Sequence, residues 1–130
     1  MLLLRLLLLF TLLPLTACTD PRANSLSRLK QVDAAELRME VSRLSTRLFP
    51  AAGPTIVPLQ PAEWPAPLLK LRPLRMNLYR DGLAVSLQAK PGFEYGLHIV
   101  PHGIPEELKS TDRTQYEKLQ DGIFYFIQKR

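Results

Sequence analysis

The 130-residue sequence contains few of the residue patterns from which active sites are commonly built. Cys18 is its only cysteine, so an internal disulfide is excluded. The six glycines stand singly, which excludes the glycine-rich loops that bind phosphates and dinucleotides. No G-x-S-x-G turn marks a serine nucleophile. These absences argue against several large classes of enzyme.

Histidine is also scarce, and its two positions do not indicate a metal site. His98 and His102 have the i, i+4 spacing that pairs side chains on a helix, but Pro101 between them argues against a helix. We interpret His98 as a solvated residue on a sheet face and His102 as a loop residue. Glu106 and Glu107 fall in a predicted loop and form no acid–base couple. We therefore expect no metal, no cofactor, no catalytic residues and no enzymatic activity.

The amino-terminal stretch carries the clearest signal in the sequence. Arg5 is its only charge, residues 6–17 are uncharged and almost wholly apolar, and this run ends in the small residues Thr16 and Ala17, directly before Cys18. This is the pattern of a secretory signal peptide. A transmembrane anchor is the alternative, but a helix over residues 6–17 would rise only about 18 Å, short of a hydrocarbon core of roughly 30 Å. We predict a signal peptide over residues 1–17.

Leu15-Thr16-Ala17-Cys18 resembles the lipobox of bacterial lipoproteins. The resemblance implies cleavage between Ala17 and Cys18, with the sulfur of Cys18 then carrying a diacylglycerol and its amine usually a third acyl chain. Attachment of two or three acyl chains would give a stable anchor, since a single acyl chain binds a bilayer only marginally. The alternative is an ordinary signal peptide that leaves Cys18 as a free thiol, a liability in an oxidising compartment. We adopt lipidation as the prediction.

The predicted location is the cell envelope. In lipoproteins of bacteria with two membranes, an Asp after the Cys usually retains the protein in the inner membrane; here that residue is Thr19, which implies the outer membrane, facing the periplasm. Without Arg5 the mature chain keeps 16 of its 17 Lys and Arg against 12 Asp and Glu. An exported lipoprotein rarely meets nucleic acid, so this balance indicates anionic head groups or simply a solvated basic surface. The expected partners are the membrane, through the lipid on Cys18, and an envelope protein.

Residues 25–130 are predicted to form one small α+β domain after a short tether over residues 18–24. Residues 25–48 read as helix, with a capping-box spacing at Asp33 and Glu36 and an apolar stripe of Leu37, Val41, Leu44 and Leu48. Leu26, Leu29 and Val32 do not continue this stripe. Two alternatives stay open: one long helix that changes its buried face, or a second short helix that ends near Asp33.

Residues 50–73 hold seven of the twelve prolines, which predicts extended, irregular chain. Apolar residues, among them Trp64, punctuate the segment. A flexible linker has no use for that apolar surface, so we interpret the segment as an ordered crossover wrapped on the domain. The alternative is a proline-rich ligand for the aromatic groove of a partner.

The remaining residues, 74–128, predict a sheet of about four antiparallel strands. Asp81-Gly82 is a two-residue hairpin signal that predicts a type I′ turn and pairs Leu78 with Val85, so one hairpin face is apolar and the other polar. Residues 95–100 and 123–128 read as further strands, and the last is apolar on both faces, as in a central strand. The polar stretch 104–120 is ambiguous, with a helical turn at 115–119. The helix is expected to cover one sheet face.

Several short segments of the second half resemble small bacterial proteins without an assigned activity, and the resemblance implies none; they include Trp64-Pro65, Leu71-Arg72-Pro73, Tyr95-Gly96-Leu97 and residues 119–125. The expected function is a non-enzymatic accessory or protein-binding role in the envelope. The alternative is an inhibitor or immunity-type lipoprotein that blocks a toxin or lysozyme. The candidate partner face lies opposite the helix, and its members are Arg75, Tyr79, His98, Phe124 and Phe126. In the competing interpretation the proline-rich crossover folds over this face and buries its rings.

Overall fold

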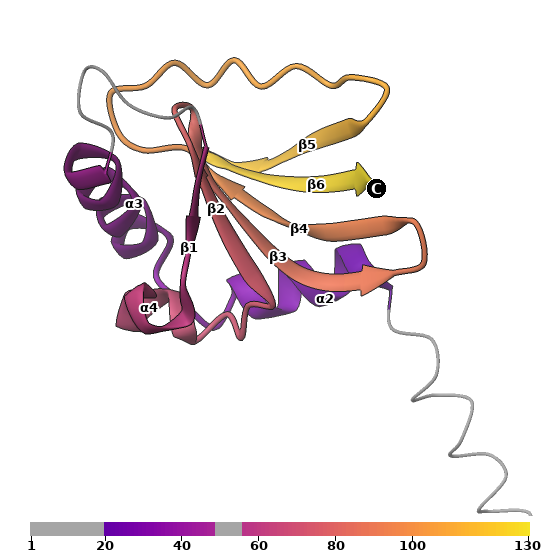
Figure 1. The fold of residues 1–130 in the computed structure, drawn as a ribbon, viewed down its shortest axis with the longest axis horizontal. Helices are drawn as coiled ribbons and strands as arrows, with labels where there is room; N and C mark the ends of the chain where they lie inside the picture. Colours follow the sequence, from indigo (N-terminus) through magenta and orange to yellow (C-terminus); the bar gives the residue numbers. More distant parts are fainter. Residues whose placement is uncertain (1–19, 49–55) are drawn as a thin grey trace, which may run out of the picture.

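The computed structural model describes residues 20–48 and 56–130, which form an α+β domain (Figure 1). Six antiparallel strands make one sheet in the order β1-β2-β3-β4-β6-β5. This confirms the predicted class, with six strands in place of about four. In chain order the elements are α2 (Pro21–Leu29), α3 (Ala34–Leu48), β1 (Ile56–Leu59), the 3₁₀ turn η1 (Pro61–Glu63), α4 (Ala66–Leu69), β2 (Arg75–Tyr79), β3 (Gly82–Lys90), β4 (Phe93–Ile99), β5 (Thr114–Gln120) and β6 (Ile123–Lys129).

The two strands that the sequence did not predict are the edge strands. β1 lies within the proline-rich segment and contains Pro58, which an edge strand tolerates because one side of its backbone needs no partner. β5 occupies residues 114–120, so the helical turn expected there is wrong. Its side chains are exposed or half-buried, and such a strand carries little hydrophobic alternation. In contrast, β6 lies between β4 and β5, which confirms the prediction of a central strand.

The β2–β3 hairpin is present, but its register differs from the prediction by two residues. Tyr79 pairs with Gly82, so Arg80 and Asp81 form the connection and Leu78 faces Leu83 rather than Val85. Asp81 does not adopt a positive φ, so the type I′ turn at Asp81-Gly82 is also wrong. A shift of two residues leaves the side chains of β2, and of β3 as far as Ser86, on their predicted faces, since the side-chain period of a strand is two. Beyond Ser86 a bulge in β3 changes the alternation, so Gln88 pairs with Tyr95 and contacts α2 instead of lying on the polar face as predicted.

The predicted helix over residues 25–48 is two helices, the second of the two alternatives. α2 ends at Leu29, and α3 begins after Asp33, whose Oδ1 accepts hydrogen bonds from the backbone N–H groups of Ala35 (2.9 Å) and Glu36 (3.3 Å). The predicted tether is too long, because α2 already begins at Pro21 behind its N-cap Asp20. Residues 21–24 therefore belong to the folded domain.

The hydrophobic core lies between the helices and one face of the sheet, which we call the helix face. Leu37, Val41 and Leu44 of α3 are buried against the strands, as the predicted stripe requires. The described part of the crossover adds Leu59, Leu68 and Leu71 to this same core. Trp64 is half-buried there and donates its indole N–H to the carbonyl oxygen of Leu59 at 3.2 Å. The crossover is thus ordered, and its described residues pack on the helix side of the sheet.

Candidate functional site

The sheet face opposite the helices, here called the opposite face, presents polar and aromatic side chains. The pairing of the strands places these side chains there. Ala84, His98 and Phe124 lie side by side across β3, β4 and β6. The next row joins Ser86, Gly96 and Phe126 to Tyr116 of β5. All five predicted partner-face residues lie on this side of the sheet: Arg75, Tyr79, His98, Phe124 and Phe126.

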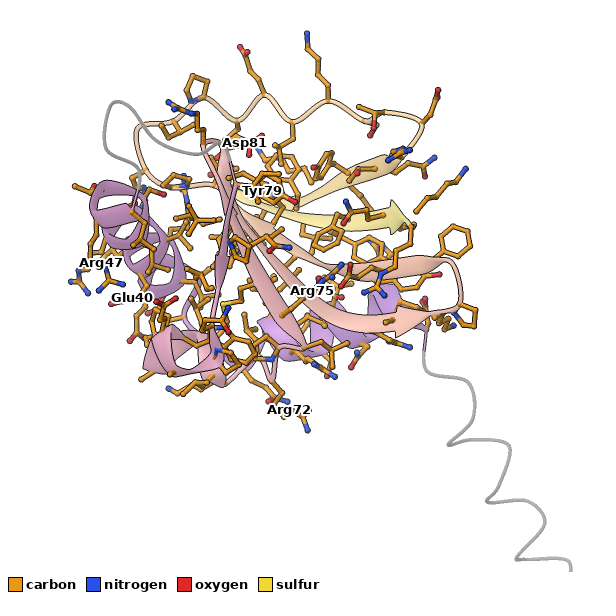
Figure 2. All side chains as sticks on the ribbon, in the orientation of Figure 1. Glu40, Arg47, Arg72, Arg75, Tyr79 and Asp81 are labelled. Carbon is orange, nitrogen blue, oxygen red and sulfur yellow. The ribbon has the colours of Figure 1, made fainter. Side chains whose placement is uncertain are left out.

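A pocket of about 110 Å³ opens on the opposite face, lined by Tyr79, Ala84, His98, Thr114, Tyr116, Phe126 and Gln128. The ring centroids of Tyr79 and Tyr116 lie 6.3 Å and 5.6 Å from that of His98, and the Tyr116 ring meets it edge-on. Figure 2 labels Tyr79 close to Asp81, near the hairpin turn between β2 and β3. Small-molecule sites usually measure about 300–1,000 Å³, so this pocket has room for one side chain rather than a substrate.

His98 lies at the back of this pocket and is held by the hairpin turn. Its side chain is 2% exposed, so the prediction of a solvated His98 is wrong. Its Nε2 lies 3.3 Å from the carbonyl oxygen and 3.4 Å from Oδ1 of Asp81. The hydrogen bond from His98 lowers the pKa of the Asp81 carboxyl below its usual range. Since Asp81 occupies Nε2, this nitrogen is a structural contact rather than a free base.

Glu94 is a buried acid on this face that the sequence interpretation placed in a loop. β4 begins one residue earlier, at Phe93, so alternation directs Glu94 to the opposite face. Its side chain is 1% exposed and is hydrogen-bonded by Arg75, and Nη2 of Arg130 lies 3.2 Å from its Oε1. Burial raises the pKa of Glu94, but the hydrogen bond from Arg75 and the nearby Ser86 and Arg130 together bring it below the usual range. The carboxylate is therefore held charged.

The predicted partner-face residues differ in accessibility. Phe124 and Phe126 are only 7% and 3% exposed, so they act as support and not as the open anchors that were expected. Tyr79 is half-buried and Arg75 exposed, which leaves both within reach of a partner. Burial raises the pKa of Tyr79 and of Tyr116, so both phenols stay protonated and can donate a hydrogen bond. None of the residues 56–73 lines the pocket.

A second hollow, of about 260 Å³, lies beside α3 and is lined by Glu40, Arg43, Leu44, Arg47, Glu63 and Pro65. Figure 2 shows Glu40 and Arg47 at this side of the molecule. The hollow is larger, but its charges are those of a solvated helix surface: Arg43 and Arg47 are exposed, and Arg43 pairs with Glu40 three residues away. The smaller pocket is the better candidate because buried polar and aromatic groups form its walls.

Across residues 20–48 and 56–130, no three His, Cys, Asp or Glu residues lie close enough together to hold a metal ion. Within the same ranges, no helix has the length and apolarity needed to cross a membrane. Ala17 and Cys18, the predicted cleavage and lipidation residues, lie outside the described residues. The chemistry that the opposite face offers is hydrogen bonding and aromatic contact.

No family model matches this sequence, and searches of the curated proteins and of the solved structures also give no match.

Proposed function

We propose that the protein is a non-enzymatic lipoprotein of the bacterial envelope, anchored by the lipid on Cys18, which binds a protein partner through its opposite face. The observation that carries the proposal is Leu15-Thr16-Ala17-Cys18 directly behind an uncharged apolar run. Thr19 after the Cys favours the outer membrane, with the domain in the periplasm. α2 begins three residues after Cys18, which suits a domain held at the bilayer surface.

The pocket between Tyr79 and Tyr116 supports the binding role. Tyrosine is a frequent interface anchor because it offers a large contact area and a polar tip at little cost in side-chain entropy. Two tyrosine rings with the Asp81 carboxylate close by favour a cationic partner side chain, since the faces of aromatic rings attract cations. We therefore propose that a Lys or Arg of the partner enters this pocket.

The anchor is tested with Cys18→Ser. We expect the mature wild-type protein to carry the mass of its acyl chains and to float with membranes, and the variant to lose both properties. Thr19→Ala serves as the control that keeps the predicted acylation site. Normal processing of Cys18→Ser together with undiminished membrane attachment would contradict a lipid anchor.

The binding face is tested by placing a photo-crosslinking residue at position 79 in living cells. Position 39 on α3 is a matched control, because Met39 is an exposed large apolar side chain on the helix side of the molecule. We expect one defined adduct from position 79 and none at that mass from position 39. Identical adducts from both positions would refute the proposal that the partner binds the opposite face.

The identity of the crosslinked protein separates the two functional alternatives. A toxin or a lysozyme in the adduct would support the inhibitor or immunity role, and a resident envelope protein would support the accessory role. Both roles use the same anchor and the same face.

A further inference from the structure

One end of the domain combines cations with an exposed aromatic ring. Lys90, Phe93 and Lys129 are neighbours across β3, β4 and β6 on the helix face. Phe93 is 37% exposed, and its ring is stacked on that of Tyr95 with centroids 6.3 Å apart. We call this group the basic tip; its residues are Lys90, Phe93, Tyr95, Arg113, Lys129 and Arg130.

Backbone hydrogen bonds tie the chain terminus into the basic tip. The N–H of Arg130 donates to the carbonyl oxygen of Gly92 at 3.0 Å, and the N–H of Lys129 donates to that of Arg113 at 2.8 Å. Within the described residues Lys90, Arg113 and Lys129 form no ion pair. Glu94, next to Phe93, is buried and pairs with Arg75 and Arg130. The exposed acids closest to the tip along the chain are Asp112, the neighbour of Arg113, and Asp20, which caps α2. The exposed cations therefore outnumber the exposed acids at this end.

The first described element, α2, begins at the same end of the domain. In Figure 1 the start of α2 lies on the same side of the domain as the turn between β3 and β4 and the C-terminus. Nδ2 of Asn24 in α2 donates to Oε1 of Gln88 near the end of β3, at 3.2 Å. Only Thr19 separates Asp20 from Cys18 in the sequence, so their Cα atoms are two steps apart, at most about 7.6 Å. A lipid on Cys18 would therefore hold the basic tip against the bilayer.

We infer that the basic tip docks on the anionic bilayer surface, with Phe93 at head-group level and the lysines on lipid phosphates. The inference rests on the lipid anchor of the proposed function. Aromatic rings favour the membrane–water interface, and exposed lysines are drawn to anionic head groups. The docked tip gives the domain one orientation. β4 runs from Phe93 to Ile99, six steps of about 3.3 Å, so the hairpin turn with Asp81 stands roughly 20 Å above the membrane.

The inference can be tested on the purified, acylated full-length product in vesicles of phosphatidylethanolamine and phosphatidylglycerol. Because acylation occupies the only native thiol, a cysteine introduced at position 91 or 121 can be labelled alone with an environment-sensitive fluorophore. Pro91 is exposed in the β3–β4 turn, and Asp121 is exposed at the far end of β6. We expect a blue shift and quenching by head-group spin-labelled lipid at position 91, and neither effect at position 121.

A matched pair of double variants then tests whether the residues of the basic tip make the contact with the membrane. Phe93→Ser with Lys129→Gln should abolish most of the quenching at position 91. Leu69→Ser with Lys70→Gln removes a similar exposed pair from α4 and should leave the quenching unchanged. Equal effects of the two pairs would overturn the assignment of the basic tip.

The outcomes separate this inference from the proposed function. If Cys18 is not acylated, the protein lacks the acyl mass and does not float with vesicles, and the anchor itself fails. If the protein is acylated and floats, but position 91 stays as exposed to water as position 121, the anchor holds and the docking inference is overturned.

Discussion

The two faces of the sheet are built from the same strands but are stabilised by different forces. On β4, Leu97 and Ile99 point to the helix face and are fully buried among aliphatic side chains. Glu94 and His98 of the same strand point the other way and are almost equally inaccessible. The helix face gains stability from removing apolar surface from water, whereas the opposite face holds its buried polar groups through paired charges and hydrogen bonds.

This difference indicates which face is suited to recognition. An aliphatic core covered by helices leaves nothing for a partner to contact. The opposite face keeps tyrosines at a pocket whose inner wall is fixed by the contact between His98 and Asp81. A binding site gains affinity when its side chains are already held in place. We expect substitutions on the helix face to act on stability and substitutions around the pocket to act on binding.

The largest effect is expected from Leu97→Ala. Leu97 is fully buried in the core, and truncation leaves a cavity that costs about 2–5 kcal/mol of unfolding free energy. Urea denaturation measures the change. Tyr116→Ala at the half-buried rim of the pocket is the comparison and should cost clearly less. Equal losses would show that the two faces contribute alike to stability.

The next effect is expected from Gly82→Val at the hairpin turn. Gly82 has a φ of +142°, and an added Cβ would lie 2.3 Å from the carbonyl oxygen of Ile99. Strained backbone of this kind costs on the order of 1–3 kcal/mol, and the clash adds to it. Gly92→Ala is the control, because its φ is also positive but no atom lies within 4 Å of the added Cβ. An unchanged melting temperature for Gly82→Val would contradict the close approach of the Gly82 backbone to the carbonyl group of Ile99.

Glu94→Gln tests the charged network of the opposite face. Losing the carboxylate weakens the contacts with Arg75 and Arg130 and should cost about 1–3 kcal/mol near neutral pH. Because the folded pKa of Glu94 lies below its ordinary value of 4.5, its contribution is fully present above that pH and is lost as the pH falls through the folded pKa. The variant should therefore show a flatter stability profile below about pH 4.5. Glu107→Gln, at an exposed loop residue, should keep the wild-type profile.

The smallest effect on stability is expected from Tyr79→Phe, which removes only the hydroxyl group. Tyr79 is half-buried, and the ring that contacts His98 remains. We expect a melting temperature close to that of the wild type, with weaker capture of the partner identified by crosslinking at position 79. Tyr79→Ala should weaken capture further, and a parallel loss of fold and capture would assign Tyr79 to the core.

Local patterns were sufficient to predict much of this fold. Leu37, Val41 and Leu44 share one helix face because their spacing follows the helical period, and the structure buries all three. Alternation placed Tyr79 and His98 on the same sheet face in spite of the wrong hairpin register, since the error was an even number of residues. These predictions held because helical and strand periodicities depend only on neighbouring residues.

Other features depend on residues that are distant in the sequence. β5 is recognisable as a strand only by its pairing with β6, because its own side chains are largely exposed. Glu94 resembles a loop acid until Arg75 and the C-terminal Arg130 are seen beside it. The buried state of His98 depends on the turn that brings Asp81 to its ring. The sequence by itself determined the α+β class, the helix stripe and the two sheet faces; only the tertiary structure decided the edge strands, the register and which polar groups are buried, because each needs a partner that folding brings from elsewhere in the chain.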